Sequence, residues 1–349
     1  MEHLPSKESF SQWLDGKEVK LLYLKNKLGW TAALTNYGAR LVSLWIPNID
    51  GKLINVVSGF NSLSDYLNAT EYYYGATVGR YANRIANATF RLANEEYRLD
   101  SFDPAYCLHG GPKGFHAQVW NVVEANEEEV VFSYTSPDGE MGFPGNLEVK
   151  VIYTMTHDGV CIRYEASTDQ PTVCNLTHHS FFNLNGSGSI EKHELLINAD
   201  YYLPLNSHLV PTGQLASVAM TPFDFRKTIA IGERIEFKDP QLIMAGGYDH
   251  NYVLVKGASQ PAAIAKGDRS GIVMRLYTDK PGLQLYTGNG LTGKNKLSNG
   301  DYDLPKSSFC LEPQYFPNSP NEPTFPSALL RPEEHYRSFT ELKFSSGLL

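Results

Sequence analysis

The protein has 349 residues and a net charge of −8, from 30 basic and 38 acidic side chains. Such a surface repels the phosphates of nucleic acids and anionic membranes, so we expect neither class of partner. Hydrophobic residues make up 42% of the chain and charged residues 19%, which excludes a disordered chain, and the many aromatic and glycine residues favour strands and turns over a helix bundle.

Alternation of apolar and polar residues predicts strands in much of the chain. In the segment 146–156, Leu147, Val149 and Val151 share one face, while Glu148 and Lys150 share the other. Comparable patterns predict strands over 18–25, 30–36, 39–46, 129–135, 160–167, 271–278 and 336–344. Helices are few, with one predicted near residues 62–67, capped by Ser62, and another near 227–232.

Asp158-Gly159 lies between two alternating segments and predicts a hairpin, because a tight turn at such a pair needs a positive φ. The chain has no internal repeat and no linker-like segment. It therefore predicts an all-β fold, a large antiparallel β-sandwich that forms a single domain over 1–349 with a core from about 18–345.

The N-terminal residues 1–5 lack the basic start and apolar stretch of a secretory signal, and no segment is apolar for long enough to span a membrane. The four cysteines show no CxxC spacing, which favours free thiols in a reducing compartment. We expect a cytoplasmic protein, although a chain whose export signal had been removed would have the same sequence.

Five polar clusters interrupt the strand pattern, and function tends to lie on such loops. They occupy residues 79–84, 108–111, 175–184, 247–251 and 311–314. Adjacent residues of a strand point to opposite faces, so we expect one of His178 and His179 to be structural and the two not to share a metal ion. Glu312 lies between Leu311 and Pro313, where burial would raise its pKa and improve it as a base. The alternative is a structural Glu312 paired with an arginine or with backbone amides.

Other catalytic patterns are absent or weak. The sequence contains no GxSxG and no HExxH, which disfavours a serine esterase and the commonest zinc proteases. Residues 288–293 match GxGxxG, but the turn-rich residues that follow do not predict the helix that a dinucleotide motif needs.

Together, in order and spacing, six motifs resemble the aldose 1-epimerase (galactose mutarotase) family. They are GRYANRIA at 79–86, LHGG at 108–111, HSFFNL at 179–184, YDHNY at 248–252, QLYTGN at 284–289 and LEPQ at 311–314. The resemblance implies a galactose mutarotase-like supersandwich that interconverts the α and β anomers of free hexoses such as galactose and glucose. It implies no cofactor and no metal, a small sugar as the binding partner, and a monomer or homodimer.

The resemblance also implies roles for individual residues. His179 would be the general acid and Glu312 the general base. The sugar site would be lined by Asn83, Arg84, His109, Phe181, Asp249 and Gln284. Phe181 stands where the family usually has Tyr, which leaves the preferred hexose open.

Two other functions stay open from the sequence. An epimerase of phosphorylated hexoses needs several cations around its pocket, and only Arg80, Arg84 and Lys113 are near the motifs. A non-catalytic carbohydrate-binding protein would explain the aromatic residues and carboxylates, but it does not need a paired acid and base.

Overall fold

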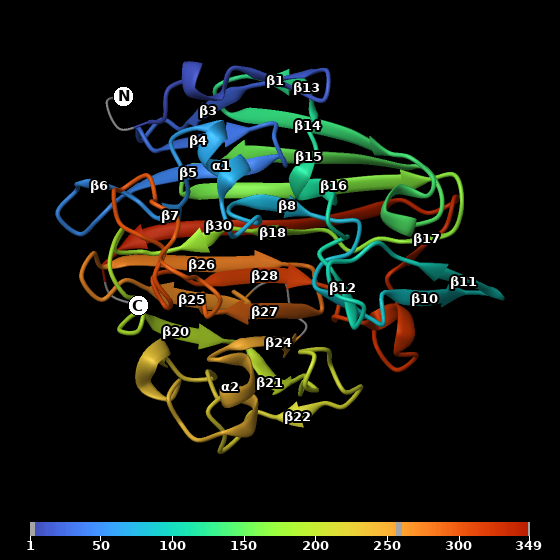
Figure 1. The fold of residues 1–349 in the computed structure, drawn as a ribbon. Coiled ribbons are helices and arrows are strands. Elements are labelled where there is room, and N and C mark those ends of the chain that lie inside the picture. The colour runs from blue at the N-terminus through green and yellow to red at the C-terminus, as the bar shows by residue number, and fades with distance from the viewer. Residues whose placement is uncertain (1–3, 256–259, 348–349) are drawn as a thin grey trace.

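A computed structural model describes residues 4–255 and 260–347 and shows a strand-rich fold with little helix (Figure 1). The predicted all-β class is confirmed. Residues 1–3, on which part of the expectation about a secretory signal rests, lie outside the described residues. Among those described, no helix combines the length and the apolar character needed to cross a bilayer.

The largest sheet has nine antiparallel strands, which run across the molecule in Figure 1. In spatial order they are β13 (Asn121–Ala125), β14 (Glu129–Ser136), β15 (Leu147–Met155), β16 (Gly159–Thr168), β30 (Tyr336–Ser346), β26 (Ile272–Thr278), β25 (Ala263–Lys266), β20 (Glu194–Ile197) and β23 (Ile229–Ala230).

Two further sheets contain five and four strands. The five-stranded sheet consists of β22 (Ala216–Ser217), β21 (Ala199–Tyr202), β24 (Asp249–Leu254), β27 (Gly282–Tyr286) and β28 (Cys310–Gln314). The four-stranded sheet consists of β3 (Leu21–Lys25), β4 (Thr31–Thr35), β5 (Arg40–Pro47) and β6 (Leu53–Asn55).

Six two-stranded pairs and a few short helices complete the described elements. The pairs are β1 (Gln12–Leu14) with β2 (Lys17–Val19), β7 (Val57–Ser58) with β19 (Phe181–Phe182), β8 (Ala76–Val78) with β18 (Thr177–His179), β9 (Arg84–Ala86) with β12 (Tyr106–Leu108), β10 (Thr89–Leu92) with β11 (Glu95–Arg98), and β17 (Thr172–Val173) with β29 (Leu329–Leu330). The helices are α1 (Leu63–Asn68), α2 (Pro240–Ala245) and the 3-10 turns Glu8–Phe10, Phe115–Ala117, Glu140–Gly142, Ile231–Glu233 and Ser319–Asn321.

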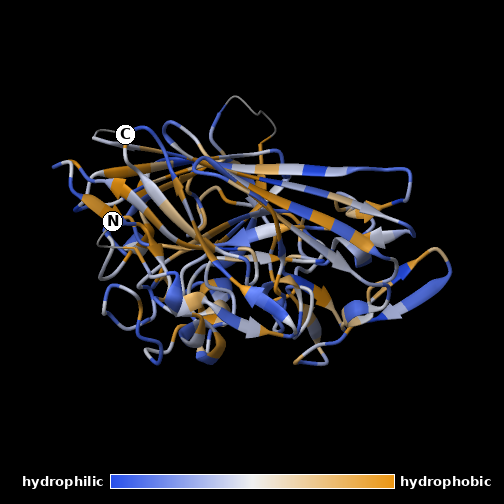
Figure 2. Cartoon of the chain, turned by 90° about the horizontal axis from the view of Figure 1, so that it is seen from above, coloured by the Kyte–Doolittle hydropathy of each residue, from blue (hydrophilic) through white to orange (hydrophobic). Residues whose placement is uncertain are grey.

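The main core lies between the three large sheets. Leu34 of the four-stranded sheet, Val151 of the nine-stranded sheet and Leu283 of the five-stranded sheet belong to one cluster of buried residues. Val149 and Val151 are buried while Glu148 and Lys150 are exposed, which confirms the predicted alternation. Figure 2 shows the same alternation as apolar and polar bands along the long strands.

The predicted hairpin at Asp158-Gly159 joins β15 to β16, with Met155 opposite Val160. The predicted reason for the glycine is wrong, because neither Asp158 nor Gly159 has a positive φ. Instead, a Cβ at Gly159 would lie 1.8 Å from the carbonyl oxygen of Leu342 in β30. The glycine therefore permits close pairing of β16 with β30.

The predicted helix near 62–67 is α1, and the Ser62 hydroxyl accepts a hydrogen bond from the Asp65 N–H, as its capping role requires. The helix predicted near 227–232 is wrong, because β23 and a 3-10 turn occupy that segment. The sequence reading missed α2, although Asp239 caps it, Pro240 opens it and Gly246 closes it with φ of 69°. No helix follows residues 288–293, as expected.

Candidate active site

The five-stranded sheet has one apolar face and one polar face. Leu283, Leu285 and Leu311 point into the main core. Successive side chains of a strand alternate between faces, so Gln284 and Glu312, which are paired in register, lie on the opposite face. Asp249 shares that face, because it lies two residues from the partner of Gln284 in β24. The sheet thus gathers three of the predicted site residues.

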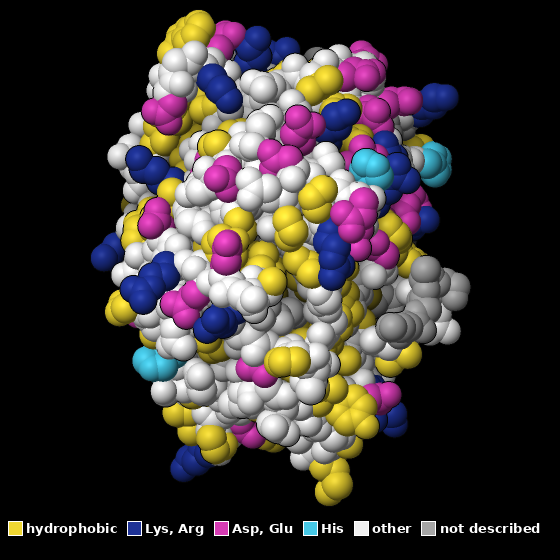
Figure 3. All heavy atoms as spheres, turned by 90° about the vertical axis from the view of Figure 1, so that its right-hand side faces the viewer, with side chains coloured by type: hydrophobic (Ala, Val, Ile, Leu, Met, Phe, Trp, Pro, Cys, Tyr) yellow, Lys and Arg dark blue, Asp and Glu magenta, His cyan; other side chains and the backbone are white. Residues whose placement is uncertain are grey.

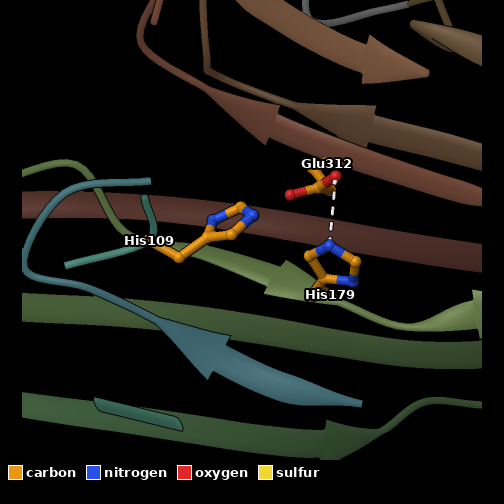
Figure 4. A group of neighbouring side chains, drawn as sticks. All are labelled: His109, His179 and Glu312. Carbon is orange, nitrogen blue, oxygen red and sulfur yellow. Dashed lines mark ion pairs between the residues drawn. The ribbon is translucent and has the colours of Figure 1, made fainter. Parts of the chain in front are cut away.

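A histidine from a different pair of strands completes the acid–base pair. His179 ends β18, and its Nε2 lies 3.7 Å from Oε1 of Glu312 (Figure 4). His109, which follows β12, lies beside them, and its ring centroid is 5.2 Å from that of His179. The three residues are 5%, 4% and 2% exposed for His109, His179 and Glu312. The structure therefore brings the predicted acid and base together in a buried site.

The neighbouring His178 points the other way, as predicted. Its ring packs against Tyr153 of the nine-stranded sheet, and its Nδ1 is hydrogen-bonded to the Ser180 hydroxyl at 2.8 Å. His178 is therefore structural, and it does not share a ligand with His179.

Burial moves the pKa values of the pair in opposite directions. Loss of water raises the pKa of Glu312 well above its usual range, and the nearby Asp249 charge raises it further. Burial lowers the pKa of His179 to about 3, mainly because the imidazolium loses its hydration. The pair consequently holds one proton over a wide pH range, and these shifts place it on Glu312 in the free protein.

His109 is fixed as a neutral donor. Its Nδ1 accepts a hydrogen bond from the Asn83 N–H at 3.1 Å, and burial lowers its pKa well below the usual value. The proton of this imidazole must then lie on Nε2, which faces His179 and Glu312 in Figure 4. Two histidines and a glutamate within 4.8 Å are a possible zinc ligand set. However, the Nε2–H of His109 suits a sugar oxygen better than a cation.

A second polar group surrounds Asp249. The Arg84 guanidinium lies 3.4 Å from Oδ2 of Asp249, and Nε2 of Gln284 donates to Oδ1 at 2.6 Å. Arg84 therefore pairs with Asp249 and not with Glu312, which answers the alternative left open by the sequence. The Arg84 charge still opposes the rise in the Glu312 pKa. Arg84 also packs against the Tyr106 ring, with its guanidinium carbon 5.3 Å from the ring centroid.

Asn83 shapes the site through its backbone. Its φ is 64°, a conformation that Asn tolerates better than most residues, and its Oδ1 accepts the Arg84 N–H at 2.9 Å. The same turn aims the Asn83 N–H at His109.

The expectation that Phe181 contacts the sugar is not supported. Its side chain has no exposed surface. The ring packs between Tyr74, at 4.5 Å between centroids, and His179, at 5.0 Å. Phe181 therefore packs against the imidazole, and it belongs to a smaller buried apolar cluster that also contains Phe60 and Tyr74.

The sequence reading missed two residues that contact the histidines. The Tyr73 ring lies 4.6 Å from the ring of His109 and 5.5 Å from that of His179. The Cys310 sulfur lies 3.6 Å from Nδ1 of His179. The run of three tyrosines at 72–74 and the position of Cys310, two residues before Glu312, were the available signals.

Three polar atoms of the site have no hydrogen-bond partner among the described residues. They are Oε2 of Glu312, Oε1 of Gln284 and Nε of Arg84, and all three are buried. An unsatisfied buried acceptor costs about 1–3 kcal/mol, so a site with two of them is prepared for a ligand with donor groups. Sugar hydroxyls are such donors, and the neighbouring Nε2–H of His109 and the Arg84 guanidinium can bind sugar oxygens.

Comparison with known proteins agrees with this geometry. Residues 20–343 match the aldose 1-epimerase family model. The galactose mutarotase of Bos taurus is 42% identical over 89% of this chain and 90% of its own length, and the aldose 1-epimerase of Escherichia coli is 38% identical over 95% and 96%.

Solved structures show the same fold. An aldose epimerase homologue from C. elegans aligns with a TM-score of 0.88 at 29% identity, over 95% of this chain and all of its own. The galactose 1-epimerase of Lactobacillus acidophilus aligns with a TM-score of 0.84 at 30% identity, over 97% of both chains. The chain belongs to the aldose 1-epimerase family.

Proposed function

We propose that this protein is a mutarotase, an isomerase that interconverts the α and β anomers of free hexoses such as galactose and glucose. The observation that carries the proposal is the buried pair of His179 and Glu312, which are 3.7 Å apart and have oppositely shifted pKa values. Opening a hemiacetal needs one proton removed from the anomeric hydroxyl and one delivered to the ring oxygen. A pair that holds a single proton can do both.

In the proposed mechanism, the single proton of the pair passes from Glu312 to His179 when the sugar binds, so that Glu312 can take the proton of the anomeric hydroxyl while His179 delivers its proton to the ring oxygen. The bond between C1 and the ring oxygen breaks and leaves a free aldehyde. Rotation about C1–C2 presents the other face of the aldehyde, and reclosure reverses both transfers. The pair ends with the proton count it started with, so no other reactant is consumed.

The surrounding residues are proposed to hold the sugar. His109 donates its Nε2–H to a sugar oxygen, Asp249 accepts hydroxyl donors, and Arg84 donates to hydroxyl oxygens. Gln284 offers its free Oε1. Asn83 and Phe181 act indirectly, since one orients His109 and the other packs against His179.

The contacts of the arginines disfavour a phosphorylated substrate. Arg80 is buried, and its guanidinium is bound to Ser136 and to the carbonyl of Pro144. Arg84 already pairs with Asp249. Neither arginine is free to hold a phosphate dianion, which needs several charge-assisted hydrogen bonds.

The remaining expectations stand as part of the proposal. We propose a single domain that acts in the cytoplasm on small sugars as a monomer or homodimer, with no nucleic-acid or membrane partner and no cofactor. The net charge of −8 suits a neutral substrate.

Polarimetry on freshly dissolved α-galactose and α-glucose tests the activity directly. We expect the protein to accelerate mutarotation of both, and Glu312→Gln and His179→Asn each to lower kcat/KM by roughly 10²–10⁴-fold, since each removes one proton transfer. Circular dichroism and thermal unfolding should show that both variants keep the fold.

Two outcomes would count against the proposal. A wild-type protein that binds hexoses without accelerating mutarotation would be a carbohydrate-binding protein. Folded variants that keep near-normal rates would show that another pair transfers the protons.

A further inference from the structure

The two ring nitrogens of His179 face two side chains of the same strand. Cys310 and Glu312 lie two residues apart in β28, so their side chains point to the same face of the five-stranded sheet. The Cys310 sulfur lies 3.6 Å from Nδ1 of His179, and Oε1 of Glu312 lies 3.7 Å from Nε2. β28 therefore contacts the imidazole at both nitrogens, and not only at the one that faces the base.

The surroundings of this imidazole fix its orientation. The ring of Phe181 lies 5.0 Å from that of His179, and the ring of Tyr73 lies 5.5 Å from it, between centroids. Figure 3 shows other histidines at the surface, where water can exchange protons with both nitrogens. His179 is buried, so the partner of each nitrogen decides which of them carries the hydrogen.

The Cys310 thiol is neutral and has no exposed surface. Burial raises its pKa well above the usual value, and the nearby Glu312 charge raises it further. A neutral thiol is a weak donor, and its sulfur is a weak acceptor. Cys310 can therefore either donate to Nδ1 of His179 or accept from it.

The proton of Glu312 decides between these two arrangements. In the free protein Glu312 holds the proton of the pair and faces Nε2 of His179. Nε2 is then an acceptor, and a neutral imidazole whose Nε2 accepts has its hydrogen on Nδ1. The backbone carbonyl of His179 also opposes the lowering of the ring pKa, as an acceptor near Nδ1 would. The Cys310 sulfur is therefore an acceptor of the Nδ1 hydrogen.

The proposed mechanism needs this tautomer. Nε2 takes the proton of Glu312, which makes His179 an imidazolium, and then gives that proton to the ring oxygen of the sugar. The hydrogen on Nδ1 stays in place in both steps. In the other tautomer Nε2 already holds a hydrogen and cannot take the proton of Glu312.

We propose that Cys310 is a positioning residue that keeps the hydrogen of neutral His179 on Nδ1 and leaves Nε2 free for proton transfer. The proposal rests on the proposed function, because it takes proton transfer through Nε2 as the step that the tautomer serves. Cys310 acts only through His179, since a fully buried side chain does not contact the sugar.

The direct test is NMR spectroscopy of protein with ¹⁵N-labelled histidine, near neutral pH and without sugar. We expect Nδ1 of His179 to show the chemical shift of a protonated nitrogen, and Nε2 that of an unprotonated one. The signals are assigned by their absence in His179→Asn. A wild-type spectrum with the hydrogen on Nε2 overturns the proposal.

Two variants separate the acceptor from the packing of the thiol. Cys310→Val fills the space without an acceptor, and we expect it to lower kcat about three- to tenfold at unchanged KM and to show both tautomers. Cys310→Ser keeps an acceptor, so it should lose less activity than Cys310→Val. A thiol that only fills apolar space predicts the opposite order, because valine suits such a space better than serine.

The controls are Cys174→Val and Cys174→Ser. Cys174 is also a buried free cysteine, but it belongs to the main core. We expect both controls to keep the wild-type kcat and the wild-type His179 spectrum. Should Cys310→Ser fail to fold, Cys310→Val decides, because an unchanged Nδ1 hydrogen in that variant overturns the proposal.

The two proposals fail in different ways. A wild type that does not accelerate mutarotation overturns the proposed function, and the role of Cys310 with it. Normal wild-type mutarotation with an unchanged kcat in Cys310→Val, or with a larger loss in Cys310→Ser, overturns the role of Cys310 alone.

Discussion

Two histidine–carboxylate pairs in this molecule each contain a buried histidine, but their carboxylates have different surroundings. His179 and Glu312 lie 3.7 Å apart, and His193 and Asp268 lie 3.3 Å apart. The carboxylate differs most, because the Glu312 side chain is 2% exposed and that of Asp268 is 25% exposed. Water therefore solvates the second carboxylate and not the first.

The hydrogen bonds of the two pairs differ as well. Nε2 of His193 accepts a hydrogen bond from the Leu184 N–H, and Oδ1 of Asp268 accepts one from the Asn185 side-chain amide. This pair therefore holds the loop after β19 in place. Oε2 of Glu312 has no partner among the described residues. Proximity of a histidine and a carboxylate thus says little by itself. What marks a site is a desolvated carboxylate with an acceptor left for a ligand.

The largest expected effect comes from making the same change in both pairs. Asp268→Asn should change kcat/KM by less than about twofold, while Glu312→Gln lowers it by roughly 10²–10⁴-fold. Polarimetry measures both rates, and thermal unfolding checks the fold. A comparable loss of activity in the two variants would show that burial of the carboxylate does not distinguish the pairs.

A smaller effect is expected at Asp249. Asp249→Asn removes the charge that holds Arg84 and Gln284, and hydrogen bonds to charged groups contribute about 1.5–3 kcal/mol, so kcat/KM should fall by about 10–100-fold. Steady-state mutarotation kinetics measure the loss. Asp200→Asn is a control, because Asp200 pairs with Arg226 on the surface away from this cluster, and its rate should not change.

The dependence of kcat/KM on pH should show how many protons the pair of His179 and Glu312 must hold. The active pair holds one proton, which is lost as pH rises through the raised pKa of Glu312, so kcat/KM should then fall about tenfold per pH unit. On the acid side, activity should persist until pH approaches the His179 pKa of about 3, where the pair takes up a second proton. Rates must be corrected for spontaneous mutarotation.

The same profile tests the electrostatic role of Asp249. Its negative charge raises the Glu312 pKa, so Asp249→Asn should move the alkaline limb to lower pH. A limb that stays in place, or moves to higher pH, would contradict the assignment of that limb to Glu312.

Much of the fold could be predicted because the alternation of apolar and polar residues can be read from neighbouring positions in the sequence. The buried and exposed residues of β15 follow directly from the sequence, and so does the capping of α1 by Ser62. The site residues were predicted from motif resemblance, since nothing local shows that Glu312 faces His179, which lies 133 positions earlier in the chain.

The parts that could not be predicted depend on tertiary contacts. The sequence does not show that Arg84 pairs with Asp249 and not with Glu312, because two separate strands set that distance. Phe181 resembles a sugar-stacking residue until the pairing of β19 with β7 buries it. The packing of Tyr73 against two histidines depends on the approach of β12 and β18, which the periodicity of the sequence does not show.

The polar and apolar faces of β27 and β28 have a consequence for evolution. A one-residue insertion or deletion inside either strand would exchange the two faces and turn Gln284 or Glu312 into the core. The lengths of β27 and β28 are therefore constrained, whereas the loops between strands can change in length. Residues can therefore be added or lost in loop segments such as 101–105, which lie outside the strands that carry the acid and the base.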